Sequence, residues 1–470
     1  MVKRPSGSFG NCLLAGLLVS VALFCGCSSV ATRRGFYEPI SADLQAHDFD
    51  AAVAKLEAAR KANKYAGKDR LIYFIDAGMA NHYAGKYEIS NEKLHQAETA
   101  AEELFTKSVS RRAASVLLND NVLEYAGEDY EVLYTNLISA LNYLALDRFD
   151  DAFVEIRRAN EKLELLEQKY ADAAEELQSG MENDTAGVNI TYEPKRVRFH
   201  NDAFARYLSM HIYAADGKYD DARIDRDLLE KAFRTQPFIY DFAMPDVRYY
   251  SEDNAILSVV ALAGLSPVKE ALNLRIRTDK DLKLVQVLYT DPKKKDSEYG
   301  HLPIDVKADY YFKFAIPTMM ARPSSVSHIR VLADGREIGE LQLLEDVTTV
   351  ATEIFETRKS LIYIRSVVRA VAKGLAAHKL KKKADTGGIA GWLKKAAIDV
   401  GTDVTENADL RSAQFLPGRI YVGDFEIAPG TYHLTVEFYA DGNLLINRME
   451  FPDYQVTRDG LNLIEAFSVN

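Results

Sequence analysis

A short turn followed by an aromatic residue recurs along the first half of the chain, each time between two amphipathic runs. The turns are Gly85-Lys86-Tyr87, Asp147-Arg148-Phe149 and Gly217-Lys218-Tyr219, with a half copy at His47-Asp48-Phe49. Apolar residues on both sides of each turn recur at three- and four-residue spacing, which predicts pairs of helices. One helical hairpin cannot bury its own apolar face, so hairpins of this kind have to stack on one another.

The layout resembles tetratricopeptide (TPR) repeats, which place small residues and an aromatic residue at fixed offsets from the turn. In that family the first helix of each pair lines a concave groove. Carried over by position, the resemblance implies a partner groove lined by Ile75, Met79, His82, Tyr134, Leu137, Leu141, Phe204, Tyr207 and His211. So apolar a groove suits an amphipathic helix or an extended peptide. The alternative is that later segments of the same chain fill it, because large apolar surfaces are rarely left exposed.

In the second half of the chain, apolar and polar residues alternate with a period of two. Alternating runs such as Leu272–Thr278, Tyr310–Ile316 and Tyr432–Phe438 predict strands. Asp334-Gly335 between two such runs is a hairpin signal. Short strands separated by glycine turns favour a β-sandwich-like domain.

A helical segment interrupts these strands. Residues 344–404 contain two amphipathic runs, the second carrying Trp392, and they predict a helical hairpin. Its basic tip consists of Lys379, Lys381, Lys382 and Lys383. A basic amphipathic helix can lie on an anionic membrane surface. The alternative is a helix packed on the β domain or in the groove of the repeats, with the lysines in solvent.

The N-terminus reads as a secretory signal. Lys3 and Arg4 precede the apolar run Cys12–Phe24, which at about 13 residues is shorter than the roughly 20 that a membrane span needs. Gly26-Cys27 after that run resembles a bacterial lipobox. The resemblance implies cleavage before Cys27, lipidation of its thiol and anchoring in a membrane. A soluble secreted protein is the alternative.

These signals combine into an α+β multidomain chain. An N-terminal α-helical TPR-like solenoid precedes a β-sandwich-like domain with a helical-hairpin insertion. The expected divisions are a signal peptide at 1–26, a tether at 27–39, helical repeats at 40–250, a β domain at 266–343 and 405–470, and the insertion at 344–404.

Composition and motifs narrow the function classes. Cleavage would remove Lys3 and Arg4 from 58 basic residues, which leaves 56 against 69 acidic ones, a net charge of −13. That balance disfavours general nucleic-acid binding. Cys12, Cys25 and Cys27 are the three cysteines, so the mature body has no thiol for catalysis or metal binding. No Walker, zincin, nucleophile-elbow or dinucleotide motif is present. We therefore expect no enzyme, no cofactor, no metal and no small-molecule substrate.

Several stretches resemble widespread bacterial lipoproteins without an established activity, which join TPR-like repeats to a C-terminal β domain. The stretches are Leu117–Asn121, Tyr125–Tyr130, Asn136–Ala145, Ala152–Arg158, Pro267–Glu270, Ala408–Ser412, Leu416-Pro417 and Pro429-Gly430. The resemblance implies a place in the outer membrane, facing the periplasm, and Ser28 after the cysteine fits that sorting.

The leading functional hypothesis is a lipid-anchored periplasmic scaffold or adaptor that binds a cell-envelope protein through the repeats. One alternative is a regulator of peptidoglycan synthesis or envelope assembly, which rests on analogy alone. Another is a membrane-surface or lipid-handling protein that uses the basic amphipathic hairpin 358–402.

Overall fold

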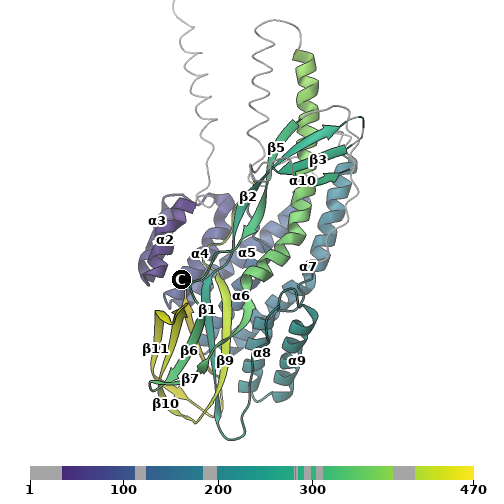
Figure 1. Cartoon of the computed structure of the whole chain (residues 1–470). Helices are drawn as coiled ribbons and strands as arrows, with labels where there is room; N and C mark the ends of the chain where they lie inside the picture. Colours follow the sequence, from purple (N-terminus) through teal and green to yellow (C-terminus); the bar gives the residue numbers. More distant parts are fainter. Residues whose placement is uncertain are drawn as a thin grey trace, which may run out of the picture.

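The computed structural model describes residues 34–111, 123–183, 198–279, 281, 284–289, 298–302, 311–384 and 408–470. Helices come first along the chain, strands follow, and one long helix separates two groups of strands (Figure 1). The chain is therefore of the α+β class. The predicted signal peptide, Cys27 and the predicted second helix of the insertion lie outside the described residues.

Four helical hairpins form the described part of the first half. They are α2 (Arg34–Gln45) with α3 (Phe49–Lys61), α4 (Arg70–Tyr83) with α5 (Tyr87–Arg111), α6 (Asp129–Ala145) with α7 (Phe149–Asn183), and α8 (Ala203–Ala215) with α9 (Tyr219–Thr235). A short 3₁₀ turn, η2 (Gly67–Asp69), precedes α4. Each helix packs on the next one along the chain.

The four turns share one backbone geometry. The second residue after each first helix has a positive φ: His47 (60°), Gly85 (68°), Asp147 (56°) and Gly217 (72°). In the second hairpin, Gly85 N–H donates to the His82 carbonyl and Lys86 N–H to the Asn81 carbonyl, and the other three turns repeat both bonds. This is the Schellman ending of a helix. The aromatic residue predicted after each turn begins the next helix.

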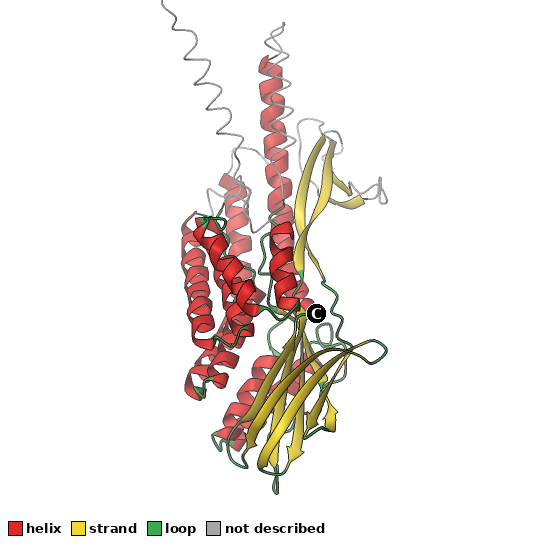
Figure 2. Ribbon diagram, turned by 90° about the vertical axis from the view of Figure 1, so that its left-hand side faces the viewer, coloured by secondary structure: helices red, strands yellow, loops and turns green. Residues whose placement is uncertain are grey.

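In the part of the chain that the structure describes, the strands form three four-stranded sheets (Figures 1 and 2). The central sheet has the order β12 (Asn462–Ser468), β1 (Ala255–Leu265), β9 (Pro417–Ile427), β8 (Gln342–Asp346). The outer sheet has the order β11 (Leu444–Val456), β10 (Gly430–Ala440), β6 (His328–Ala333), β7 (Arg336–Glu340). The third sheet has the order β4 (Glu298–Leu302), β3 (Leu284–Tyr289), β2 (Val268–Asp279), β5 (Tyr311–Met320).

The central sheet lies between the helices and the outer sheet, so both of its faces are buried. Along β1, Leu257, Val259 and Ala261 join a core shared with the outer sheet. Val260 and Leu262, on the other face, join the core of the helices. Since β1 is covered on both sides, its sequence is a nearly continuous apolar run and does not alternate between apolar and polar residues.

A long helix, α10 (Val347–Ala384), packs along β5 of the third sheet (Figure 1). Its first turns also contact α6, α7 and β9. Leu361 and Ile364 of α10 share a buried cluster with Ile276 and Phe314 of the third sheet. The interruption predicted at 344–404 therefore begins as this helix.

The predicted strands are confirmed, but β1, β4 and β8 were not expected. Strands β2 to β5, which lie in the range 266–343 assigned to the β domain, form a sheet of their own beside α10. Within the described ranges, none of the helices combines the length and the apolarity that a membrane crossing requires.

Candidate functional site

The residues predicted to line a partner groove all lie on α4, α6 and α8, and all are buried. The set is Ile75, Met79, His82, Tyr134, Leu137, Leu141, Phe204, Tyr207 and His211, each at most 4 % exposed. The sequence left open whether these residues line an open groove or are covered by later segments of the chain, and in the structure the central sheet covers this inner face of the helices. The alternative of a groove filled by the chain itself describes what is observed.

On α4, His82 joins the helices to the central sheet. Its Nε2 lies 2.7 Å from Glu465 Oε1 of β12, and its Nδ1 lies 2.7 Å from Asn142 Oδ1 of α6. Burial disfavours the charged ring, but the Glu465 carboxylate and both hydrogen bonds outweigh it and raise the pKa of His82. Both neighbours are acceptor oxygens, so the charged ring can donate a hydrogen bond from each of its nitrogens.

On α6, the Tyr134 hydroxyl donates to Glu345 of β8. Tyr240 O–H donates to the other oxygen of the same carboxyl group at 3.1 Å. Burial, followed by the nearby Asp202 carboxyl, raises the pKa of Glu345 well above its ordinary value. Both hydroxyl groups donate to this carboxyl group, so each of its oxygens has a hydrogen-bond partner in the interior.

On α8, Tyr207 O–H donates to Asp424 Oδ1 of β9 at 2.7 Å. His211 Nε2 lies 3.1 Å from the same oxygen, and the backbone N–H of Arg248 donates to Asp424 Oδ2 at 2.9 Å. Helices α4, α6 and α8 thus each contact a carboxyl group on a different strand of the central sheet.

The segment 408–416, just before β9, also packs against the inner face. The backbone N–H of Ala413 donates to Glu131 Oε1 and that of Gln414 to Asp76 Oδ1, both at 2.7 Å. Burial raises the pKa of Asp76 to about 8. The carboxyl groups of Glu131 and Asp76 thus accept hydrogen bonds from backbone N–H groups of the segment 408–416, which lies outside the strand pairs described for β9.

Buried ion pairs fix the same segment at its start. Arg411 is 2 % exposed, and its guanidinium binds Asp69 at 3.1 Å and Asp409 at 2.7 Å. Beside it, Glu128 pairs with Lys269 and Arg358. We call this group of six residues the ionic cluster.

The ionic cluster brings together three of the stretches that carry the family resemblance, Tyr125–Tyr130, Pro267–Glu270 and Ala408–Ser412. The Tyr125 ring contacts two of the three cations, with Lys269 Nζ 5.1 Å and Arg411 Cζ 5.2 Å from its centroid. Sequence reasoning noted these stretches but did not predict that they meet. Their charges are mutually neutralised, which gives the cluster a structural role in holding helices and sheets together.

Other predicted site residues fall outside this description. Cys27 is not among the described residues. Lys379, Lys381, Lys382 and Lys383 lie in the last turns of α10, and only their backbone is described.

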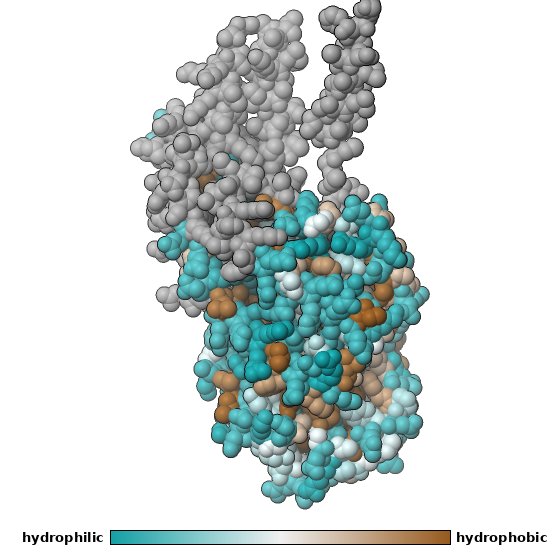
Figure 3. Space-filling model, turned by 180° about the vertical axis from the view of Figure 1, so that it is seen from behind, coloured by the Kyte–Doolittle hydropathy of each residue, from teal (hydrophilic) through white to brown (hydrophobic). Residues whose placement is uncertain are grey.

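The outer side of the helices carries an open groove along α5, which we call the α5 groove. A hollow of about 580 Å³ runs between α4, α5 and the end of α6, and a second of about 430 Å³ continues it between α5 and α7. His95 and Thr99 border both. The face seen in Figure 3 is mostly hydrophilic, with apolar side chains in small separate groups.

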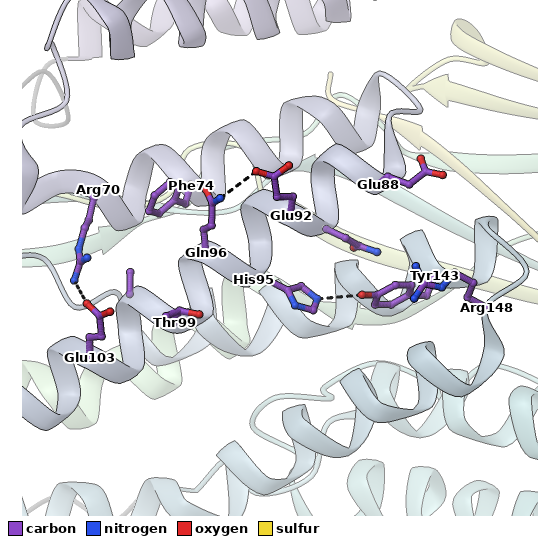
Figure 4. Close-up of a pocket in the computed structure, with 12 residues that line it drawn as sticks. Arg70, Phe74, Glu88, Glu92, His95, Gln96, Thr99, Glu103, Tyr143 and Arg148 are labelled. Carbon is purple, nitrogen blue, oxygen red and sulfur yellow. Dashed lines mark hydrogen bonds and ion pairs between the residues drawn. The ribbon is translucent and has the colours of Figure 1, made fainter.

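Both ends of the first hollow carry paired side chains (Figure 4). At one end, Arg70 Nη2 binds Glu103 Oε2 at 2.6 Å. At the other, the Arg148 guanidinium lies 4.7 Å from the centroid of the Tyr143 ring. Between them, Tyr143 Oη lies 3.3 Å from His95 Nε2, and the half-buried Phe74 provides an apolar wall.

The lining of the α5 groove is net acidic. Its glutamates are Glu88, Glu92, Glu98, Glu102, Glu103 and Glu161, against the cations Arg70, Arg148, Arg158 and Lys162. Arg158 and Lys162 both bind Glu98. Among the described residues, Glu88, Glu92 and Glu161 make no ion pair.

The chemistry that the α5 groove offers is recognition. It combines two aromatic walls, solvent-exposed carboxylates and fixed hydrogen-bonding groups. In the part of the chain that the structure describes, no three His, Cys, Asp or Glu side chains are grouped so that they could hold a metal ion. Sequence reasoning missed this groove, since its residues read as the ordinary charged face of an exposed helix.

Comparisons of the chain with protein-family models, with curated proteins and with solved structures gave no significant match.

Proposed function

We propose that this protein is a lipid-anchored scaffold of the bacterial periplasm, held to the outer membrane at Cys27, which binds a cell-envelope protein through its helical hairpins. The signal-like N-terminus that ends in Gly26-Cys27 supports the anchor. The body then extends from the membrane as a rigid platform for a partner.

The repeats support the scaffold role. Four hairpins share one Schellman turn and one aromatic position after it, which favours a TPR-like solenoid. The central and outer sheets, which share an apolar core, favour a β-sandwich-like domain. On this interpretation the sandwich-like domain fills the concave side of the solenoid and stiffens it.

The observation that carries the proposal is the contrast between a filled inner face and the open α5 groove. A partner cannot reach Tyr134 or Tyr207 unless the central sheet leaves, because both side chains are fully buried. It can reach the α5 groove without any rearrangement. We therefore assign partner binding to the outer side of the second and third hairpins.

In-cell photo-crosslinking tests this assignment. A photo-reactive amino acid replaces Gln96, on the wall of the α5 groove, in otherwise intact cells. A matched variant carries it at Tyr207 on the inner face. We expect one discrete envelope protein to be trapped from position 96 and only adducts within the chain from position 207. No partner from position 96, with a partner from 207, would overturn the proposal.

A further inference from the structure

Asn91 is an unusual member of the α5 groove because it is buried and has a free donor. The residue is 5 % exposed and lines the hollow between α4, α5 and α6. Its Oδ1 accepts a hydrogen bond from Asn142 Nδ2 at 2.8 Å. Its Nδ2 has almost no exposed surface and no hydrogen-bond partner among the described residues. A buried polar atom without a partner is uncommon and needs an explanation.

The orientation of this amide follows from a chain of hydrogen bonds that crosses the helical layer. His82 is bound on one side by Glu465, and its Nδ1 donates to Asn142 Oδ1. Asn142 must then donate from its own amide nitrogen, and Asn91 Oδ1 accepts that bond. Asn91 is left with its N–H groups as the end of the chain. An acceptor oxygen from a bound molecule would satisfy this donor once the Asn91 side chain turns toward the hollow that it lines.

Carboxylates border the same hollow. Glu88 and Glu92 are exposed on the same stretch of α5, and neither makes an ion pair among the described residues. Gln96 Nε2 donates to Glu92 Oε1 at 3.1 Å, which orients that carboxylate. A ligand that offers an oxygen to Asn91 therefore meets negative charge beside it. The carboxylates of Glu88 and Glu92 would repel a phosphate or a free carboxylate at this position. A ligand with a neutral carbonyl next to a cation would be attracted instead.

An extended polypeptide supplies both groups. Its backbone carbonyls are unpaired, whereas those of a helix are already bound within the helix. Lysine and arginine side chains supply the cation. The groove wall runs along α5 from Glu88 to Glu103, about 22 Å at 1.5 Å per residue. That length accommodates about six or seven extended residues at roughly 3.3 Å each.

We infer that the α5 groove binds an extended, lysine- or arginine-containing segment of the partner, with a backbone carbonyl accepting a hydrogen bond from Asn91 Nδ2 and a basic side chain against Glu88 and Glu92. The aromatic walls Phe74 and Tyr143 hold an apolar side chain of that segment. This inference rests on the proposed scaffold function and names the chemistry of its partner.

Selection from a displayed library of random heptapeptides tests the inference, with the full chain in detergent as the target. We expect the selected sequences to be enriched in lysine and arginine. Each enriched peptide is then synthesised with a fluorescent label and titrated. Replacement of both carboxylates, Glu88→Gln with Glu92→Gln, should weaken binding at least tenfold. Selected peptides without basic enrichment would overturn the inference.

Asn91→Asp is the decisive variant. It keeps the oxygen that accepts from Asn142 and removes the free donor, while it adds a negative charge that should attract a basic peptide. Charge alone would tighten binding, whereas loss of the hydrogen bond to a carbonyl should weaken it about tenfold. Gln168→Glu, on the exposed face of α7, makes the same change of charge outside the groove and should leave binding unchanged. Unchanged or tighter binding by Asn91→Asp would contradict the proposed contact.

The two proposals can fail separately. A partner trapped from position 96 in cells, without selection of basic peptides, would remove this inference and leave the scaffold function standing. Basic peptides that depend on Asn91, without any partner trapped in cells, would remove the scaffold function and leave the recognition chemistry of the groove. Melting temperatures of all variants within a few degrees of the parent chain exclude misfolding as the cause.

Discussion

The inner and outer faces of the helical layer carry similar side chains in opposite situations. On the inner face, His82, Tyr134 and Tyr207 are buried, and each is bound to a carboxyl group of the central sheet. In the α5 groove, His95 is half-buried, Glu88 is exposed, and Asn91 keeps a donor free. The buried groups of the inner face are paired with the central sheet and maintain the fold, whereas the exposed Glu88 and Glu92 of the α5 groove are accessible to a ligand.

The comparison also separates two kinds of variant. Changes on the inner face should lower the free energy of unfolding, because they leave buried charges or polar atoms unpaired. Changes in the α5 groove should alter binding and leave stability nearly unchanged.

The largest expected effect is at the ionic cluster. Arg411→Met leaves Asp69 and Asp409 buried without their cation, and we expect a loss of about 3–5 kcal/mol in the free energy of unfolding. Arg148→Met, at the rim of the α5 groove, is the matched control and should change it by less than about 0.5 kcal/mol. Urea unfolding measures both. Similar losses in the two variants would break the distinction between the faces.

A smaller effect is expected at His82, and it depends on pH. His82→Leu should cost about 1–3 kcal/mol, because Glu465 and Asn142 lose their partner. The pKa of His82 is raised in the folded chain, so its contribution is complete below the unfolded value of 6.5 and is lost as the pH rises through the folded value. The deficit of the variant should therefore be largest near pH 6 and shrink above it. A deficit that grows with pH would contradict the His82–Glu465 ion pair. The variant His95→Leu, in the α5 groove, is the control for the outer face.

At position 76 the folded chain favours the neutral form of the side chain, whereas at His82 it favours the charged form. For Asp76, the pKa of about 8 lies above the ordinary value of 3.8, so the folded chain binds the proton more tightly and stability falls as the pH rises between these values. Asp76→Asn keeps an oxygen for the Gln414 N–H and removes the ionisation. At pH 8.5 it should be more stable than the parent chain by more than about 1.4 kcal/mol, the equivalent of one pKa unit. Equal pH profiles from thermal melts would rule out a neutral Asp76.

The smallest effect on stability is expected in the groove itself. The double variant Glu88→Gln with Glu92→Gln removes two exposed carboxylates that make no ion pair among the described residues. Its free energy of unfolding should stay within about 0.5 kcal/mol of the parent value, since isolated surface charges contribute little. A larger loss by calorimetry would mean that these carboxylates support the fold.

Sequence reasoning located the four turns because their signals are local. An aromatic residue two positions after a glycine, aspartate or histidine of positive φ marks each of them. The filled inner face had no such signal, since His82 and Glu465 lie 383 residues apart in the chain. Strand β1 was not predicted, because burial on both faces removes the alternation of apolar and polar residues on which strand prediction depends.

The candidate site was missed for a related physical reason. A stripe of Glu88, Glu92, Gln96 and Thr99 is what any solvent-exposed helix face presents. Its distinguishing property is the free N–H of Asn91, which depends on hydrogen bonds to α6 that no local pattern encodes.

Thiol labelling tests the central claim, that the inner face is closed and the α5 groove is open, most directly. With Cys12, Cys25 and Cys27 replaced by serine, the chain has no other cysteine, so a single thiol introduced by Leu141→Cys or Thr99→Cys reports on one face. We expect Thr99→Cys to react with a maleimide almost as fast as a free thiol. Leu141→Cys should react about a thousandfold more slowly, because exposure requires an opening that costs several kcal/mol. Equal rates at the two positions would show that the central sheet leaves the helices freely and would contradict the claim.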